Sequence, residues 1–296
     1  MMNYYNEIKT EILNNEITKK VKDYSKNKSD LTTYYNVGKL LSEAGKHYGE
    51  GIIKEYSDKL TKEFGKGYSQ RNLRNMRQFY CVSTKWQTLS AILSWSIYCE
   101  LIWFDNINKI NYYITICKEQ NLSVRELRKR IKNKEYERLD ESTKLKLIKQ
   151  ETLKVEDAIK NPIIINNRFN YEVISEKVLQ KIILEDIEEF MKELGNSFCF
   201  IGSEYPIKVG CNYNYIDLLL YNIEFNCYVV IELKITKLKK EHIGQIEVYM
   251  NYIDKNLSKP TQDKTIGIIL CKKDNKFIME YCSDERIHIR EYNLIK

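Results

Sequence analysis

The sequence predicts an α+β protein of two domains, an all-α domain over residues 1–160 and an α/β domain over residues 168–296. Apolar residues in the first part recur at helical spacing, as Ile8 and Ile12 do. The second part holds short apolar runs typical of buried strands, separated by helical segments, which predicts a mixed sheet flanked by helices. Asn161-Pro162 interrupts the chain between the two parts.

Turn and capping residues divide the first part into separate helices. Gly45 and Gly65-Lys66-Gly67 mark turns. Ser69 is placed to cap the helix that follows it, and Ser123 has capping-box spacing with Glu126. We therefore expect helices over residues 5–24, 32–44, 49–64, 70–80, 88–103, 106–120 and 124–133, and a charged connecting helix over 134–160.

The second part alternates between helical and extended patterns. Gly195 is placed to end the first helix, and a short turn between two apolar runs predicts a hairpin. We expect a linker or short strand over 163–170, helices over 172–194, 237–254 and 277–282, and strands over 198–201, 205–209, 215–222, 226–234, 265–271 and 287–292.

Positive charge is concentrated in the first part of the chain. Residues 1–160 hold 30 Lys and Arg against 21 Asp and Glu, whereas residues 161–296 hold 18 against 20. A basic part joined to a near-neutral part suggests that one attracts a polyanion while the other performs chemistry. The alternative is that the lysines only solvate helix surfaces.

Cysteine usage and hydropathy indicate the class of protein. The 8 cysteines include no CxxC pair, which argues against a zinc site. Several lie within apolar runs, as free thiols in a reducing compartment would. No stretch approaches 18 uninterrupted apolar residues, and the start of the chain is too polar for a signal peptide. We expect a cytoplasmic protein with no membrane association.

Two apolar runs carry charged residues where a buried strand should have none. Asp217 lies inside the first run, and Glu232 and Lys234 lie two apart in the second, so both of those side chains emerge on one face. Burying an ionised carboxylate without a partner is costly. Two carboxylates and an ammonium group on adjacent strands favour a site for a hard divalent cation, Mg²⁺ above all. The alternative is a structural ion pair at a strand end.

Two basic helices are candidate nucleic-acid-binding elements. Arg71, Arg74 and Arg77 recur every third residue of the helix that follows Ser69, opposite its apolar face. This helix could lie in a major groove or along phosphates. Arg125 and Arg128 begin a second basic stretch, which is better suited to phosphate contact than to reading a base sequence. The alternative in both cases is a solvated helix face.

The ordered motifs resemble a known family, the YhcG-like bacterial nucleases of the PDDEXK superfamily. The resemblance covers roughly residues 5–296. In the second part it rests on Phe198-Cys-Phe-Ile-Gly202, Ile216-Asp-Leu-Leu-Leu-Tyr221, Ile231-Glu-Leu-Lys234 and Gly244-Gln245 with Tyr249. In the first part it rests on Tyr35-Asn-Val-Gly38-Lys39, Phe64-Gly-Lys-Gly67-Tyr-Ser69, Arg71-Asn-Leu73, Leu93-Ser-Trp-Ser96 and Ser123-Val-Arg-Glu-Leu127.

The resemblance implies a role for each matching residue. Asp217 and Glu232 match the metal-binding acids, and Lys234 matches the catalytic lysine. Gln245 and Tyr249, four residues apart on one helix face, match the polar pair that follows the lysine, and we expect Gln245 to position a water molecule or a phosphate. Glu188 matches an acid that some members add to the metal site, although it could equally be a surface carboxylate.

The resemblance implies a restriction-endonuclease-like fold for the second domain and a Mg²⁺- or Mn²⁺-dependent endonuclease acting on DNA. The helical domain would bind DNA or assemble a homodimer or higher homo-oligomer. Two alternatives stay open, a catalytically silent DNA-binding or scaffold protein of a defence or restriction system and an RNA nuclease. The chain departs from the family pattern at Gly202-Ser203-Glu204 and at Ile97, but at none of the expected metal ligands.

Overall fold

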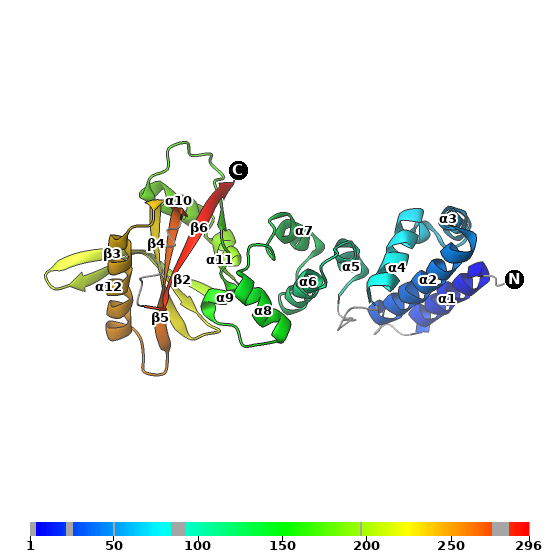
Figure 1. Cartoon of the computed structure of the whole chain (residues 1–296), viewed down its shortest axis with the longest axis horizontal. Helices are drawn as coiled ribbons and strands as arrows, with labels where there is room; N and C mark the ends of the chain where they lie inside the picture. Colours follow the sequence, from blue (N-terminus) through cyan, green and yellow to red (C-terminus); the bar gives the residue numbers. More distant parts are fainter. Residues whose placement is uncertain are drawn as a thin grey trace. The chain divides into compact units, whose positions relative to one another are not determined.

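The computed structural model describes residues 4–21, 26–49, 51–83, 93–195, 197–273 and 284–295. The chain divides into two compact units, Met1–Lys132 and Asn133–Lys296, which are considered separately below (Figure 1). An all-helical first unit and a mixed sheet with helices in the second confirm the predicted fold class. Within the described ranges, no helix is both long enough and apolar enough to cross a membrane.

The first unit consists of short helices in the order that the sequence predicts. Helix α7 begins after the expected capping box, in which the Glu126 carboxylate accepts from the Ser123 amide while Ser123 Oγ accepts from the Glu126 amide. Residues 84–92 lie outside the described residues, as does the beginning of the helix predicted at 88–103. The elements are α1 (Tyr4–Val21), α2 (Lys26–Tyr48), α3 (Ile52–Phe64), the 3-10 helix η1 (Lys66–Tyr68), α4 (Gln70–Ser83), α5 (Trp95–Leu101), α6 (Ile107–Glu119) and α7 (Val124–Lys132).

A close approach of two helix backbones organises the first four helices. Helix α2 packs on α4, and Leu41 and Leu73 are fully buried in their shared core. A Cβ atom at Gly38 would lie 2.1 Å from the backbone oxygen of Met76 in α4. Glycine is therefore required at Gly38, because any side chain would push the two helices apart.

The second unit begins earlier in the chain than the sequence analysis expects. Residues 133–160, expected in the first domain as one connecting helix, belong to the second unit and form two short helices, α8 (Glu141–Lys149) and α9 (Val155–Ala158). Helix α8 ends at Gln150, which takes a left-handed conformation with φ 56°. Such a residue redirects the chain, so a continuous charged helix does not form.

Buried ion pairs stabilise this segment as part of the second unit. Arg138 pairs with Glu193 and donates to the backbone oxygen of Pro162 at 2.7 Å. Lys160 and Glu135, both buried, pair at 3.7 Å. Breaking a buried pair leaves an unpaired charge and is strongly destabilising. The Arg138 contacts therefore hold the segment on the second unit, whereas the Lys160–Glu135 pair lies within the segment.

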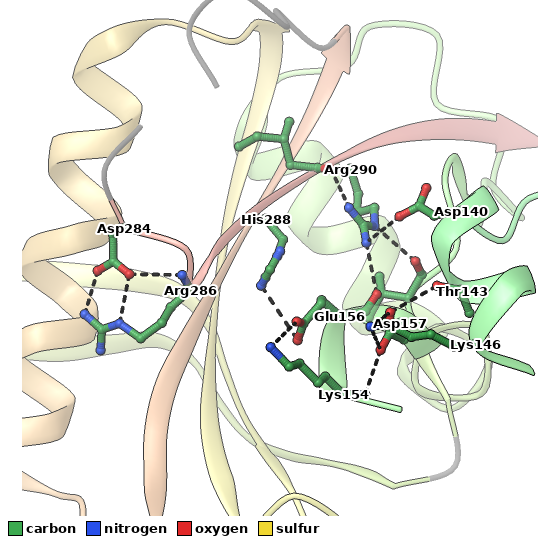
Figure 2. Close-up of polar contacts among 12 residues, drawn as sticks. Asp140, Thr143, Lys146, Lys154, Glu156, Asp157, Asp284, Arg286, His288 and Arg290 are labelled. Carbon is green, nitrogen blue, oxygen red and sulfur yellow. Dashed lines mark hydrogen bonds and ion pairs between the residues drawn. The ribbon is translucent and has the colours of Figure 1, made fainter. Parts of the chain in front are cut away.

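Arg290 provides the second attachment, shown in Figure 2. Its guanidinium group donates to the backbone oxygens of Ile159 and Glu156, both at 3.0 Å, and pairs with Asp140 at 3.3 Å. Within the same segment, Asp157 accepts from Lys146 at 2.7 Å. A single arginine on the last strand thus binds two backbone oxygens at α9 and an acidic side chain of the same segment, which holds this segment on the sheet.

The second unit is built on a six-stranded mixed sheet with the order β1-β6-β5-β4-β3-β2. Strands β2, β3 and β4 pair in antiparallel fashion, whereas β4, β5, β6 and β1 pair in parallel. The strands are β1 (Ile163–Asn166), β2 (Phe198–Val209), β3 (Asn212–Asn222), β4 (Cys227–Lys237), β5 (Asp263–Lys273) and β6 (Ile287–Ile295). The helices between them are α10 (Glu176–Glu185), α11 (Ile187–Leu194) and α12 (Lys240–Asn256).

Two details of this unit differ from the expected elements. The helix expected over 172–194 is divided at Asp186, whose non-helical backbone (φ −136°, ψ 44°) ends α10 and begins α11. The two strands expected over 198–209 are one strand with a register shift between Phe200 and Gly202. The helix expected over 277–282 lies outside the described residues.

Helices cover both faces of the sheet. Helices α10 and α11 pack on one face, where Leu179 and Ile183 meet Leu220 and Ile231. Helix α12 packs on the other face, where Ile246 and Met250 belong to the same cluster as Val230 and Ile269. The strands buried on both faces explain the continuous apolar runs in the sequence.

We expect Gly38→Ala to destabilise the first unit by about 3 kcal/mol, because the added Cβ collides with backbone and not with a flexible side chain. The measurement is guanidinium unfolding of the full chain followed by tryptophan fluorescence, since the 3 tryptophans all lie within the first unit. Gly51→Ala is the matched control, because Gly51 has helical backbone angles and open space around it. An equal midpoint for Gly38→Ala and the control would contradict the packing argument.

Candidate active site

The candidate site lies where strands β3 and β4 separate. Their ladder runs from Asn222↔Cys227 to Leu218↔Ile231, and Asp217 and Glu232 are the next residues on the two strands. Beyond this point β3 continues in a ladder with β2 alone. The Leu233 amide donates to Asp217 Oδ2 at 2.7 Å, so a side-chain carboxylate replaces the backbone acceptor that a longer ladder would supply.

The strand pair is irregular at the same place. On β2, the residue across from Asp217 is Glu204, between the pairs Ser203↔Leu218 and Tyr205↔Ile216, and Glu204 has a left-handed backbone with φ 45°. From the other side, Gln180 of α10 donates to the backbone oxygen of Asp217 at 2.9 Å. The backbone around Asp217 is therefore held by side chains as well as by the ladder.

The five residues predicted to carry the chemistry lie together. Lys234 Nζ and Gln245 Nε2 both donate to Glu232 Oε1 at 2.9 Å. Gln245 Nε2 also donates to the Tyr249 hydroxyl at 2.9 Å. The strand alternation places Glu232 and Lys234 on the face that α12 covers, and the four-residue spacing on α12 places Gln245 above Tyr249.

Burial and like charge perturb the carboxyl groups of the site. Burial, and then the neighbouring charge of Asp217, raise the pKa of Glu232 to about 7. Burial also raises the pKa of Asp217, against the effect of the Leu233 amide. Burial alone would lower the pKa of Lys234, but the Glu232, Glu176 and Asp217 carboxylates together hold it above its ordinary value. The ammonium group therefore stays charged at neutral pH.

The donor set fits a hard divalent cation. Glu232 Oε2 is buried and has no hydrogen-bond partner, although Oε1 of the same group has two. An unpaired buried carboxylate oxygen is costly unless a cation completes it. The described part of the chain contains no cluster of three or more His, Cys, Asp or Glu side chains able to hold a metal. An ion here would have two carboxylate ligands and take the rest from backbone oxygens, water or substrate.

Glu188 lies apart from this group. Its side chain is 80% exposed on α11 and pairs with Lys192 one helical turn away at 2.6 Å. This pairing lowers the pKa of Glu188. The structure therefore gives it the surroundings of a surface carboxylate, and we leave it out of the proposed site.

Three polar residues near the site are not among the predicted site residues. Glu176, the first residue of α10, lies 3.6 Å from Lys234 Nζ. Gln180 lies one turn further along α10, and His242 of α12 is buried, with its pKa lowered by burial and by the charge of Lys234. The fold alone brings α10 beside β4, so no spacing in the sequence identifies Glu176. The Ser175 N-cap is a local signal that locates the start of its helix.

The predicted nucleic-acid contacts differ in their surroundings. On α4, Arg71 and Arg74 are exposed, while Arg77 is half-buried, and its guanidinium lies 3.5 Å from the Cβ position of Gly45. On α7, Arg125 is exposed. Arg128 pairs with Glu100 at 2.7 Å, which raises the pKa of its guanidinium. Arg128 is therefore already engaged within the protein.

Two protein-family models match this chain, one over each part. The family described as the DUF1016 N-terminal domain matches residues 2–138, and the YhcG PDDEXK nuclease domain matches residues 156–295. The chain therefore belongs to the YhcG/DUF1016 family, whose members join this N-terminal domain to a C-terminal PDDEXK nuclease domain.

The chain is also similar to individual proteins. The Escherichia coli (strain K12) protein named "Putative nuclease YhcG" is 27% identical over 283 residues, which span 81% of this chain and 76% of that protein. Among solved structures, a repair endonuclease from Pyrococcus abyssi and an EndoMS–dsDNA complex each match with 20% identity and a TM-score of 0.30. Each match covers 41% of this chain and about half of the other, 48% and 47% respectively.

We expect Glu232→Gln to stabilise the second unit in metal-free buffer, increasingly as the pH rises. The wild-type carboxyl has a pKa of about 7 when folded against an ordinary 4.5, so the folded state holds the proton more tightly. Wild-type stability is therefore lost as the pH rises from about 4.5 to 7, by about 3 kcal/mol in total. Thermal unfolding of both proteins, followed by circular dichroism across this pH range, measures the difference.

Glu188→Gln is the matched control, because it removes the same charge from an exposed carboxylate whose pKa is not raised. The difference in unfolding stability between Glu188→Gln and wild type should not grow with pH. A pH-independent difference for Glu232→Gln would mean that the Glu232 carboxyl is not destabilised by its burial.

Proposed function

We propose that this protein is a metal-dependent endonuclease that hydrolyses phosphodiester bonds in DNA, with Asp217 and Glu232 as ligands of Mg²⁺ or Mn²⁺. The observation that carries the proposal is the buried, unpartnered Oε2 of Glu232 beside a second carboxylate and a charged lysine. The Lys234–Glu232 ion pair uses only Oε1 of this carboxylate, so Oε2 remains available to a cation. Membership of a PDDEXK nuclease family supports the same reading.

A bound divalent ion supplies charge stabilisation to the scissile phosphate. Lys234 contributes as a cation, because its raised pKa keeps it protonated at neutral pH, and it is therefore unsuited to accept a proton. Its ammonium offsets negative charge that develops on the phosphate. Gln245 orients Glu232 and positions water or phosphate, and Tyr249 fixes Gln245.

Glu176 completes the surroundings of the lysine. Its carboxylate lies 3.6 Å from Lys234 Nζ and is 44% exposed, whereas Glu232 is almost fully buried. Lys234 is thus held between a buried and an accessible carboxylate. This position suits a lysine that must move between an ion pair and a substrate phosphate.

The helical unit supplies the DNA-binding surface in this proposal. Helix α4 carries exposed Arg71 and Arg74 with half-buried Arg77, and α7 carries exposed Arg125. Guanidinium groups bind phosphates without regard to sequence, so this surface raises the local concentration of DNA. Cutting both strands of a duplex usually uses two active sites, one for each strand, and we therefore propose a homodimer or higher homo-oligomer as the active form.

We expect Lys234→Ala and Asp217→Asn to lower the cleavage rate by at least about 100-fold, because each removes a charge that acts at the phosphate. DNA affinity should stay close to that of wild type. The assay incubates labelled duplex DNA, single-stranded DNA and RNA with Mg²⁺, Mn²⁺ or a chelator, and DNA binding is measured in the chelator.

Glu188→Gln is again the control and should cleave as wild type does. Equal nicking by wild type and Lys234→Ala would contradict the assignment and point to a contaminating nuclease. Binding of DNA without cleavage under any metal would favour the scaffold alternative, and cleavage confined to RNA would favour the ribonuclease alternative.

We expect the triple variant Arg71→Ala, Arg74→Ala, Arg77→Ala to weaken DNA binding equally for unrelated sequences. The slope of log affinity against log salt should fall by about 3, since each phosphate contact contributes about 0.9. The control removes three exposed lysines from α3 of the same unit, Lys54, Lys59 and Lys62. An equal loss in both variants would assign the effect to net charge and not to α4.

A further inference from the structure

The β2–β3 pair extends beyond the sheet as a two-stranded arm, which we define as residues 205–216 (Figure 1). Within the arm the strands pair from Tyr205↔Ile216 to Val209↔Asn212. Strand β4 pairs with β3 only from Leu218 onward. The arm therefore begins next to Asp217. Residues 212–216 of the arm belong to β3, the strand that carries this proposed metal ligand.

One face of the arm is anchored. Ile207 is paired with Asn214 across the ladder, and its side chain is 1% exposed. It packs in the same cluster as Ile246 and Met250 of α12. This contact fixes the arm's orientation, because Ile207 lies halfway along it.

The opposite face is exposed and aromatic. The pairs Lys208↔Tyr213 and Pro206↔Tyr215 share this face, since directly opposite residues of a ladder point the same way. Tyr213 is 63% exposed and Tyr215 is 56% exposed. Lys208 Nζ lies over the Tyr213 ring, 5.8 Å from its centroid. Two accessible rings and a cation thus stand together on the face of the arm opposite Ile207.

The spacing of the rings suits stacked bases. Residues two apart on a strand are about 7 Å apart. This is about twice the 3.4 Å rise of successive bases in a nucleic-acid strand, so the gap between two tyrosines matches the space that one stacked base occupies. Tyr215 is also only two residues from Asp217, within about one nucleotide of the proposed metal ligand.

We propose that the arm binds an unpaired stretch of the substrate strand, with Tyr213 and Tyr215 stacking on bases and Lys208 contacting a phosphate. This inference rests on the proposed nuclease function and names the substrate feature that the site recognises, single-stranded bases next to the cleaved bond. Aromatic side chains provide such binding without sequence preference, because every base has a flat face.

The chemistry of the face favours a nucleic acid over a second copy of this chain. The cores of protein–protein interfaces are enriched in tyrosine but depleted in lysine. The exposed face offers two phenol rings, a proline and an ammonium group, so Lys208 is the feature that distinguishes a nucleic acid from a second copy. The ammonium group of Lys208 complements a phosphate in charge. Because it lies over the Tyr213 ring, it is close to the backbone of a nucleic-acid strand whose bases stack on that ring.

The test compares the double variant Tyr213→Ala, Tyr215→Ala with the double variant Tyr213→Phe, Tyr215→Phe. Binding of fluorescent single-stranded and duplex DNA to the full chain is measured by anisotropy in a chelator, and cleavage is then measured with Mg²⁺. We expect the alanine variant to bind single-stranded DNA about 10-fold more weakly or worse. The phenylalanine variant should bind as wild type does, because stacking does not need the hydroxyl. Duplex binding should change little.

Ile223→Ala is the matched control, since Ile223 is 64% exposed at the turn that joins the other end of β3 to β4. Unchanged binding of single-stranded DNA by the alanine variant would overturn the inference. The proposed nuclease function would stand in that case if the wild type cleaves DNA. A wild type that binds DNA but never cleaves it would overturn the proposed function. The ratio of the single-stranded DNA affinities of the alanine variant and the wild type would still decide the arm's role. Light scattering measures the oligomer mass of the alanine variant. If this mass falls while the affinity for single-stranded DNA is unchanged, the face makes contact between copies and the inference is overturned.

Discussion

Strands β3 and β4 separate where each carries a carboxylate, and the rest of the site follows from that separation. Pairing stops at Leu218↔Ile231, and Asp217 accepts the next amide, from Leu233, with its side chain. Two acids are thereby held close together, Glu232 buried and Asp217 partly buried, where ionising both is costly without a cation. Lys234 and Gln245 satisfy one oxygen of Glu232, and the other stays unpaired. The proposed metal site, the charged lysine and the raised pKa of Glu232 all follow from this one geometric feature.

Much of this could be predicted from the sequence, because the constraints involved are local. A strand face repeats every second residue and a helix face every fourth, so Glu232 with Lys234, and Gln245 with Tyr249, were placed together before any fold was known. The capping box at Ser123 and Glu126 is an equally local signal, and it marks the start of α7 as expected. Apolar runs with charges inside them indicated both the strands and the chemistry.

The remaining features depend on tertiary contacts that leave no such pattern. Glu176 reaches Lys234 only because α10 packs across β4, while Glu188, chosen by resemblance, stays exposed and pairs with Lys192. Residues 133–160 look like a solvated charged helix, yet Arg138 and Arg290 bind them to the sheet unit. Likewise, the number of basic residues in the helices predicts nucleic-acid binding, but Arg128 already forms an ion pair with Glu100. Pairing between distant charges therefore limits what composition and spacing can predict.

The most direct measurement is a crystal structure of the full chain soaked in Mn²⁺, with anomalous scattering used to locate the ion. The account predicts one strong peak between the carboxylates, about 2.2 Å from an oxygen of Asp217 and from Oε2 of Glu232, completed by further oxygen ligands. A Mn²⁺ ion bound elsewhere, with Glu232 Oε2 still unpartnered, would contradict the assignment of these two residues as the metal site.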